Sequence, residues 1–134
     1  EPAGCLSICG LDELSNKMDI KGKNIVCIIS GGNNDIMRYP EILEKNKVYL
    51  GLKHYYIIEF SQKPLELRRF ISKVLDEKDD ITRFEYIKKT NKTFGNVLVG
   101  FETENCMELE KKMGDNCFRF RKIDENDLIY SYLV

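Results

Sequence analysis

Between residues 52 and 134, the spacing of apolar residues switches several times between the two-residue period of strands and the longer period of helices. The order of these switches limits the fold more than any other feature of the sequence. The run LKHYYIIEF is typical of a β-strand, and a helix is predicted to begin at Pro64, with Glu66 in its first turn. Apolar residues then recur at intervals of three and four, which predicts one buried helical stripe. That stripe comprises Leu67, Phe70, Ile71, Val74 and Leu75.

The second half of this segment repeats the pattern. DDITRFEYIKKT and FGNVLVGFET alternate as two strands joined at a turn formed by Asn91 and Lys92, which predicts a hairpin over residues 79–103. A second helix, ending at Gly114, precedes the short strand CFRFRKI and the apolar terminal run DLIYSYLV. The apolar positions of that helix are Cys106, Leu109 and Met113. The order is β-α-β-β-α-β, so we expect an α+β domain with the ferredoxin-like fold over residues 50–134.

Residues 1–49 follow a different order of helix, strand, loop and helix. The corresponding stretches are GCLSICGLDELSNKM, NIVCIIS, GGNND and IMRYPEILEK, the last begun or bent by Pro40. A strand that is apolar on both faces needs cover from both sides, which so short a segment cannot supply. We therefore expect residues 1–49 to be an excerpt of a larger α/β domain. By itself, the loop SGGNND is compatible with a phosphate nest, a plain tight turn or a cofactor site.

Charge, hydropathy and cysteine content exclude several classes of function. The 21 basic and 22 acidic residues leave a formal charge of -1, which attracts neither nucleic acid nor a membrane surface. The apolar runs are too short to span a bilayer and no signal peptide is evident, so a cytoplasmic location is expected. The five cysteines are predicted to be reduced core thiols. Cys5 and Cys9 could share a metal, but His54 and the other thiols are not spaced to complete a site, so no metal is expected.

An RNA-recognition module has the same order of strands and helices. Its third strand would need basic and aromatic side chains on the exposed face. Opposite Val97, Val99 and Phe101 the sequence offers only Leu98, Gly100 and Glu102. We therefore expect no nucleic-acid partner.

Two distant parts of the chain resemble one protein family. EPAG, CLSICGLDEL and GKNIVCIISGGNND resemble the end of the catalytic domain of biosynthetic threonine dehydratases (threonine ammonia-lyases), which are pyridoxal-phosphate enzymes of the tryptophan-synthase-β type. The stretch from GLKHYYIIEF to GNVLVGFE, with DDITRFEY its most specific run, resembles their C-terminal ACT-like regulatory domain. The resemblance implies that residues 1–49 end the cofactor domain and that residues 50–134 form the regulatory domain.

The resemblance also implies site residues. In that family the serine that opens the SGGN loop hydrogen-bonds the pyridine nitrogen of pyridoxal phosphate, which places this role on Ser30, with Glu1 of EPAG near the cofactor. The family's Schiff-base lysine and glycine-rich phosphate loop have no counterpart in this chain. It is therefore expected to be catalytically silent, although the parent enzyme converts L-threonine to 2-oxobutanoate and ammonia for isoleucine synthesis.

ACT-like modules bind amino acids at the loop after their first strand. By resemblance, the effector is isoleucine or valine, its candidate contacts are Ser61, Gln62 and Tyr86, and the protein is a homo-oligomer. The family's Pro-Gly pair is Pro64-Leu65 here, and a leucine side chain opposes close approach of the ligand to the backbone. The alternative is that the module only mediates oligomerisation and binds no ligand.

Overall fold

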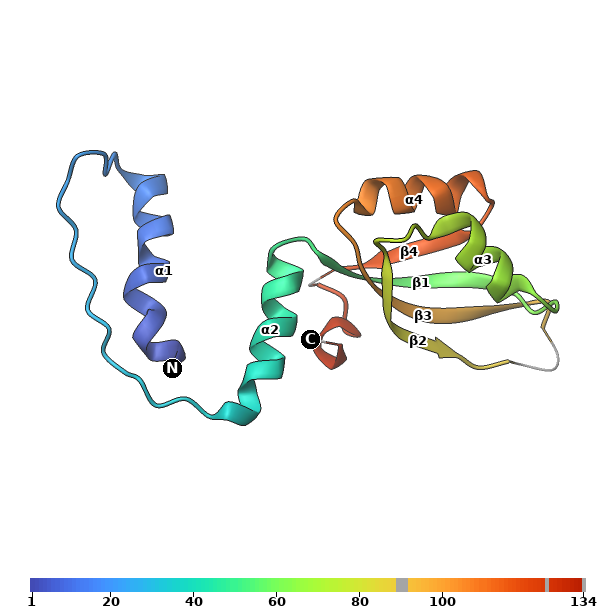
Figure 1. The fold of residues 1–134 in the computed structure, drawn as a ribbon, viewed down its shortest axis with the longest axis horizontal. Coiled ribbons are helices and arrows are strands. Elements are labelled where there is room, and N and C mark those ends of the chain that lie inside the picture. Colours follow the sequence, from blue (N-terminus) through green and yellow to red (C-terminus); the bar gives the residue numbers. More distant parts are fainter. Residues whose placement is uncertain (89–91, 125, 134) are drawn as a thin grey trace. The chain divides into compact units, whose positions relative to one another are not determined.

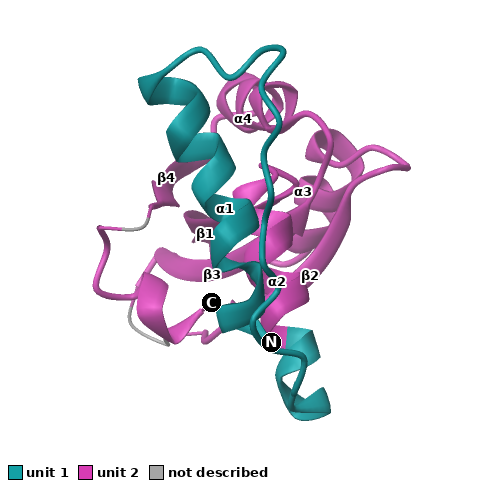
Figure 2. Ribbon diagram, turned by 90° about the vertical axis from the view of Figure 1, so that its left-hand side faces the viewer, with its two compact units in different colours: residues 1–40 teal, residues 41–134 magenta. Residues whose placement is uncertain are grey.

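The structure is a computed structural model that describes residues 1–88, 92–124 and 126–133. The chain divides into two compact units, Glu1–Pro40 and Glu41–Val134, which are coloured separately in Figure 2. No helix among the described residues is long and apolar enough to cross a membrane.

The first unit contains one long helix and an extended segment. Helix α1 spans Pro2–Lys17 and the short 3-10 helix η1 spans Ile36–Arg38. The strand expected at residues 24–30 is absent, so that prediction is wrong: the segment is extended but pairs with no strand. Its apolar side chains are exposed, Val26 by 87% and Ile28 by 75%. Without a neighbouring strand the ladder hydrogen bonds that define a β-strand cannot form.

The second unit has the predicted β-α-β-β-α-β order. Its elements are α2 (Tyr39–Tyr49, which begins just before the unit), β1 (Lys53–Ser61), α3 (Glu66–Val74), β2 (Asp80–Tyr86), β3 (Phe94–Glu102), α4 (Cys106–Asp115), β4 (Arg119–Ile123) and the 3-10 helix η2 (Tyr130–Tyr132). The four strands form one antiparallel sheet in the order β2-β3-β1-β4. Helices α3 and α4 cover one face of it (Figure 1). The ferredoxin-like α+β fold is therefore confirmed, and the hairpin is formed by β2 and β3.

The hydrophobic core lies between this sheet and its two helices. Alternate residues of β1 and β3 point into it, and the helices contribute residues three and four apart. Its fully buried members include Tyr56, Ile58, Val97, Val99, Phe101, Phe70, Val74 and Met113. Phe70 meets Phe118 edge to face with ring centroids 5.0 Å apart. Each such buried side chain contributes about 1.5–3 kcal/mol relative to exposure, so this core dominates the stability of the unit.

Helix α3 departs from its prediction in two ways. Phe70 and Val74 are buried as expected, but Leu67 and Ile71 keep 42% and 46% of their surface exposed, so only part of the predicted stripe packs on the sheet. The helix begins at Glu66, and Pro64 lies in the turn before it rather than at the first helical position. Nine helical residues give little more than two turns, which a flat sheet can cover on one side only.

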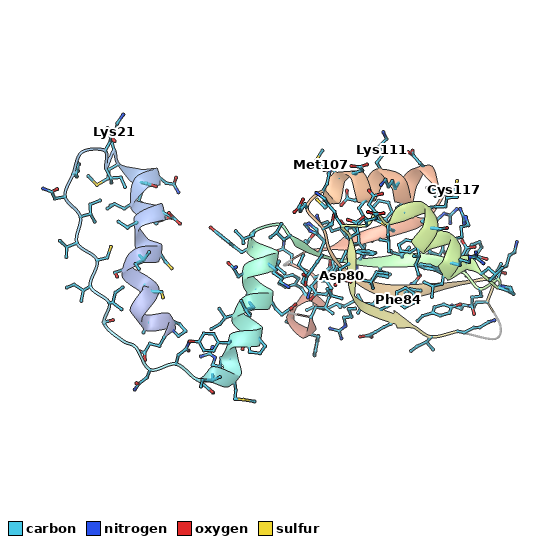
Figure 3. All side chains as sticks on the ribbon, in the orientation of Figure 1. Lys21, Asp80, Phe84, Met107, Lys111 and Cys117 are labelled. Atoms are coloured by element: carbon cyan, nitrogen blue, oxygen red, sulfur yellow. The ribbon has the colours of Figure 1, made fainter. Side chains whose placement is uncertain are left out.

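The cysteines are not core residues, which corrects another prediction. All five thiols are free; Cys5, Cys9 and Cys117 are exposed, while Cys27 and Cys106 are partly buried. Cys117, which is labelled in Figure 3, lies just beyond the end of α4. The expected turn residue Asn91 lies outside the described residues.

Candidate functional site

A small cavity lies where β1 runs into α3. Its volume is about 180 Å³, and its lining includes Phe60, Ser61, Gln62, Leu65, Phe84 and Tyr86. At about 30 Å³ per water molecule it has room for roughly six waters, which suits a free amino acid better than a peptide. All three residues predicted to contact an effector, Ser61, Gln62 and Tyr86, therefore meet at one cavity.

The amino end of α3 lies at this cavity, because Leu65, Glu66 and Leu67 are among its lining residues. The first helical hydrogen bond joins the Arg69 amide to the Leu65 carbonyl at 2.9 Å. The three amides before it, from Glu66 to Arg68, have no acceptor within the helix. No side chain caps them, because the N-cap residue is Leu65. Such a helix end favours a negatively charged group.

Leu65 lies in the left-handed region of backbone conformation, which favours glycine. Its φ of 68° and ψ of 4° are left-handed, a region that costs a residue with a side chain about 1–2 kcal/mol. Its side chain is 73% exposed. The loop therefore adopts this conformation without burying the leucine. The side chain can hinder a ligand's approach to the backbone only through the part of it that lines the cavity.

Aromatic rings form the apolar wall of the cavity. Phe60 is 2% exposed and meets Phe84 edge to face, with centroids 6.0 Å apart. Tyr86 lies 6.5 Å from the same ring and keeps 39% of its surface exposed. Phe84 comes from β2, as Figure 3 shows. These rings offer a surface for a branched apolar side chain.

The polar groups that line the cavity differ in how far hydrogen bonds within the protein already use them. Gln62 is buried, and its Nε2 donates to the Phe94 carbonyl at 3.2 Å, so part of its amide holds β3 in place. The Ser61 hydroxyl accepts from the Lys63 amide at 3.4 Å, a long contact that a ligand can replace. Lys63 and Lys88 add positive charge to the lining, and the carboxylate of Glu66, which also lines the cavity, is paired with Arg69. The arrangement suits a carboxylate beside an apolar group.

The resemblance-implied cofactor residues also lie close together, within the first unit. A Cβ added to Gly31, the residue after Ser30, would stand 2.3 Å from Oε1 of Glu1, and a Cβ added to Gly4 would stand 2.3 Å from the Gly31 carbonyl oxygen. The loop therefore needs glycine at this point, with the Glu1 carboxylate beside the residue that follows Ser30. No group of three or more metal-ligating side chains occurs among residues 1–88, 92–124 and 126–133.

One charged cluster was not anticipated from the sequence. Lys53 is 5% exposed and forms ion pairs with Glu44 of α2 and with Glu102 of β3, the latter at 3.5 Å. Lys47 also binds Glu102, at 2.7 Å. Burial opposes the charge of Lys53, but its hydrogen bond to Glu44 and the surrounding negative charge raise its pKa above the ordinary value. No local pattern signals this cluster, because Lys47 and Glu102 are 55 residues apart.

Sequence comparisons assign the family. The profile described as "C-terminal regulatory domain of Threonine dehydratase" matches residues 44–133. All of this chain aligns with proteins named "L-threonine dehydratase biosynthetic IlvA", at 51% identity in Mycobacterium bovis, 45% in Staphylococcus saprophyticus and 43% in Bacillus subtilis. It spans about a third of their length, 31–32% in each case. The chain therefore belongs to the family of C-terminal regulatory domains of threonine dehydratases.

Proposed function

We propose that residues 50–134 bind isoleucine or valine and regulate a pyridoxal-phosphate-dependent L-threonine ammonia-lyase. One observation carries the proposal: Ser61, Gln62 and Tyr86 line a single cavity beside the uncapped amino end of α3. The relatives are named biosynthetic threonine dehydratases, and the family description is regulatory.

The cavity suggests how such an effector is oriented. Its carboxylate would accept hydrogen bonds from the free amides of α3, with the charge of Lys63 nearby. Its branched side chain would lie against Phe60, Phe84 and Tyr86. Regulation further requires that the effector bind two states of the enzyme unequally, because equal affinity shifts no equilibrium.

The activity of the whole enzyme is part of the proposal. It deaminates L-threonine to 2-oxobutanoate and ammonia in the cytoplasm, as a homo-oligomer. Pyridoxal phosphate, when bound, supplies the electron sink for this elimination. Ser30 would donate a neutral hydrogen bond to its pyridine nitrogen, and Glu1 would lie near the cofactor. This chain contributes those two contacts and no Schiff-base lysine, so by itself it does not catalyse the reaction.

A thermal-shift titration of the chain with isoleucine and valine tests effector binding. At one hundred times the dissociation constant, a specific ligand stabilises the folded state by about 2.7 kcal/mol. Ser61→Ala and Tyr86→Phe each remove one polar group and are expected to weaken binding by about 0.5–1.5 kcal/mol. Tyr132→Phe, at a tyrosine 84% exposed and not among the cavity residues, is the matched control.

The absence of a thermal shift would contradict effector binding. If neither amino acid raises the melting temperature of a folded sample, the cavity is not an effector site. The alternative, an oligomerisation module without a ligand, then stands.

A further inference from the structure

Two residues other than glycine have a left-handed backbone conformation within the described part of the chain. Leu65, just before α3, has a φ of 68°, and Cys117, just beyond α4, has a φ of 61°. This region is sterically unfavourable for a residue that carries a side chain. Such strain persists only where surrounding contacts hold the backbone, and it is frequent at ligand sites and switch regions.

Arg69 contacts the residue next to each of these two positions. Its Nη1 donates to Oε1 of Glu66, the residue after Leu65, at 2.5 Å. Its Nη2 donates to the backbone carbonyl of Asn116, the residue before Cys117. One guanidinium group therefore joins the turn before α3 to the turn after α4, although Arg69 and Asn116 are 47 residues apart.

A third contact fixes the direction of the Arg69 side chain. Its guanidinium carbon lies 4.7 Å from the centre of the Phe118 ring, so a cation–π contact accompanies the two hydrogen bonds. Phe118 is 5% exposed and packs on Phe60 with ring centroids 5.5 Å apart. The planar guanidinium presents its donors in a fixed fork, so one group serves two acceptors and a ring together.

One end of this link lies at the effector cavity. Glu66 and Phe60 both line the cavity, and they are in contact with Arg69 and Phe118 respectively. A carboxylate bound at the free amides of α3 would stabilise the first turn of that helix, which carries both Glu66 and Arg69. A first turn that frays less would keep Arg69 on the Asn116 carbonyl for more of the time.

The other end of the link is a turn with two backbone hydrogen bonds of its own. The amides of Cys117 and Phe118 donate to the carbonyls of Gly114 and Met113, each at 2.9 Å. This pattern ends many helices, and its left-handed position is most often a glycine. A turn of this kind at the protein surface opens locally, and the exchange of its amides measures how often it does so.

We propose that Arg69 is a positioning residue that couples the effector cavity to the turn between α4 and β4. An amino acid bound at the first turn of α3 then holds turn 116–118 closed through the Arg69 side chain. The inference rests on the proposed function, because it requires an amino acid in the cavity. It adds the place in the second unit where binding is registered, in the form of a coupling between two sites.

The test is amide hydrogen exchange of the chain, resolved by mass spectrometry, with and without saturating isoleucine. In the unmodified chain the ligand should slow exchange in the first turn of α3, and should slow it at least about fivefold at the Cys117 and Phe118 amides. Arg69→Gln should keep the first effect and reduce the second to less than about twofold. Arg68→Gln removes the same charge at an exposed neighbouring position outside these contacts and should behave as the unmodified chain. Exchange in α1 is the internal reference.

Two results would overturn the inference while effector binding stands. Isoleucine would slow exchange at the turn equally in the unmodified chain and in Arg69→Gln, or it would slow exchange in α3 alone. No effect of isoleucine or valine on α3, on the turn or on the melting temperature would refute effector binding itself, and the inference with it.

A second variant keeps the inference testable if Arg69→Gln does not fold or does not bind, which circular dichroism and the exchange of α3 establish. Arg69→Lys retains the positive charge, but a single ammonium does not reproduce the fork that serves both acceptors and the ring. It should also lose the effect at the turn. If neither variant binds isoleucine, Arg69 belongs to the binding site itself and the coupling role is wrong.

Discussion

The two units of the chain contain similar apolar stretches but bury them very differently. NIVCIIS in the first unit is rich in β-branched residues, and YYIIEF in β1 of the second is rich in β-branched and aromatic residues. In β1, Tyr56 and Ile58 have no exposed surface, whereas Val26 and Ile28 of the first unit are among the most exposed apolar residues of the chain. The single buried residue of α1 is Gly4.

The difference shows that composition does not by itself make a β-strand. Strand β1 is flanked by β3 and β4 and covered by α3 and α4, so its backbone groups are paired and its inner face is dry. Segment 24–30 has no strand beside it, and its hydrogen bonds to α1 include the Ser7 hydroxyl donating to the Ile28 carbonyl at 2.9 Å. Pairing and cover, rather than residue type, decide which apolar run becomes a strand.

The largest expected effect comes from removing one isoleucine from each unit. Ile58→Ala leaves a cavity in the core and should lower the free energy of unfolding by about 2–5 kcal/mol. Ile28→Ala removes a side chain 75% exposed and should change it by less than about 0.5 kcal/mol. Guanidinium denaturation followed by circular dichroism measures both. Equal effects of the two variants would contradict the contrast between the units.

The ion pairs of the two units are expected to differ in their contribution to stability. Lys53→Ala leaves Glu44 and Glu102 without their buried cation, and because these carboxylates are partly exposed we expect a loss of about 1–3 kcal/mol. Lys17→Ala removes the pair with Glu13 on α1, where both side chains are more than 60% exposed, and should cost less than about 0.5 kcal/mol. The same denaturation experiment applies. A Lys53 variant as stable as the Lys17 variant would show that the cluster adds nothing.

Two glycines of α1 differ in the space around them. A Cβ at Gly4 meets the Gly31 carbonyl oxygen at 2.3 Å, whereas a Cβ at Gly10 meets nothing within 4 Å. Gly10→Ala should stabilise the helix by about 0.5–1 kcal/mol, and Gly4→Ala should lose this gain because the loop is displaced. Hydrogen exchange of the α1 amides measures the effect. Equal protection in both variants would mean that the loop does not rest on Gly4.

The smallest effect concerns pH. The hydrogen bond from Lys47 holds the pKa of Glu102 below its ordinary value, and its partial burial opposes this only in part. A lowered pKa in the folded state adds stability above the unfolded value of about 4.3, and that stability is lost as the pH falls through the folded value. Glu102→Gln should therefore flatten the acid limb of the stability curve, by less than about 1 kcal/mol. Glu13→Gln on α1 is the control, and an identical curve for both variants would argue against the contribution of Glu102.

Much of the second unit could be predicted because its signals are local. The period of the apolar residues located every strand and both helices, and it identified Phe70 and Val74 as core residues. The three proposed effector contacts came from family resemblance, and the fold brings them to one cavity although 24 residues separate Gln62 from Tyr86. Their role in binding stays a prediction.

The errors share one cause, which is that burial depends on neighbours distant in sequence. Leu67 and Ile71 satisfy the helical period, yet a two-turn helix resting on a sheet leaves them partly in solvent. Segment 24–30 has strand composition, yet no strand lies beside it. The cysteines follow apolar patterns, yet none reaches the core.

The sequence by itself determined the order of elements in the second unit, its ferredoxin-like fold and the family, because backbone periodicity and motif order are properties of neighbouring residues. Only the tertiary structure decided three things. It showed that Leu65 adopts the left-handed conformation of a glycine, that Lys53 is buried between two carboxylates, and that Arg69 contacts both Glu66 of α3 and Asn116 after α4. Each depends on strand register and on contacts across the fold, which fix distances that no local pattern records.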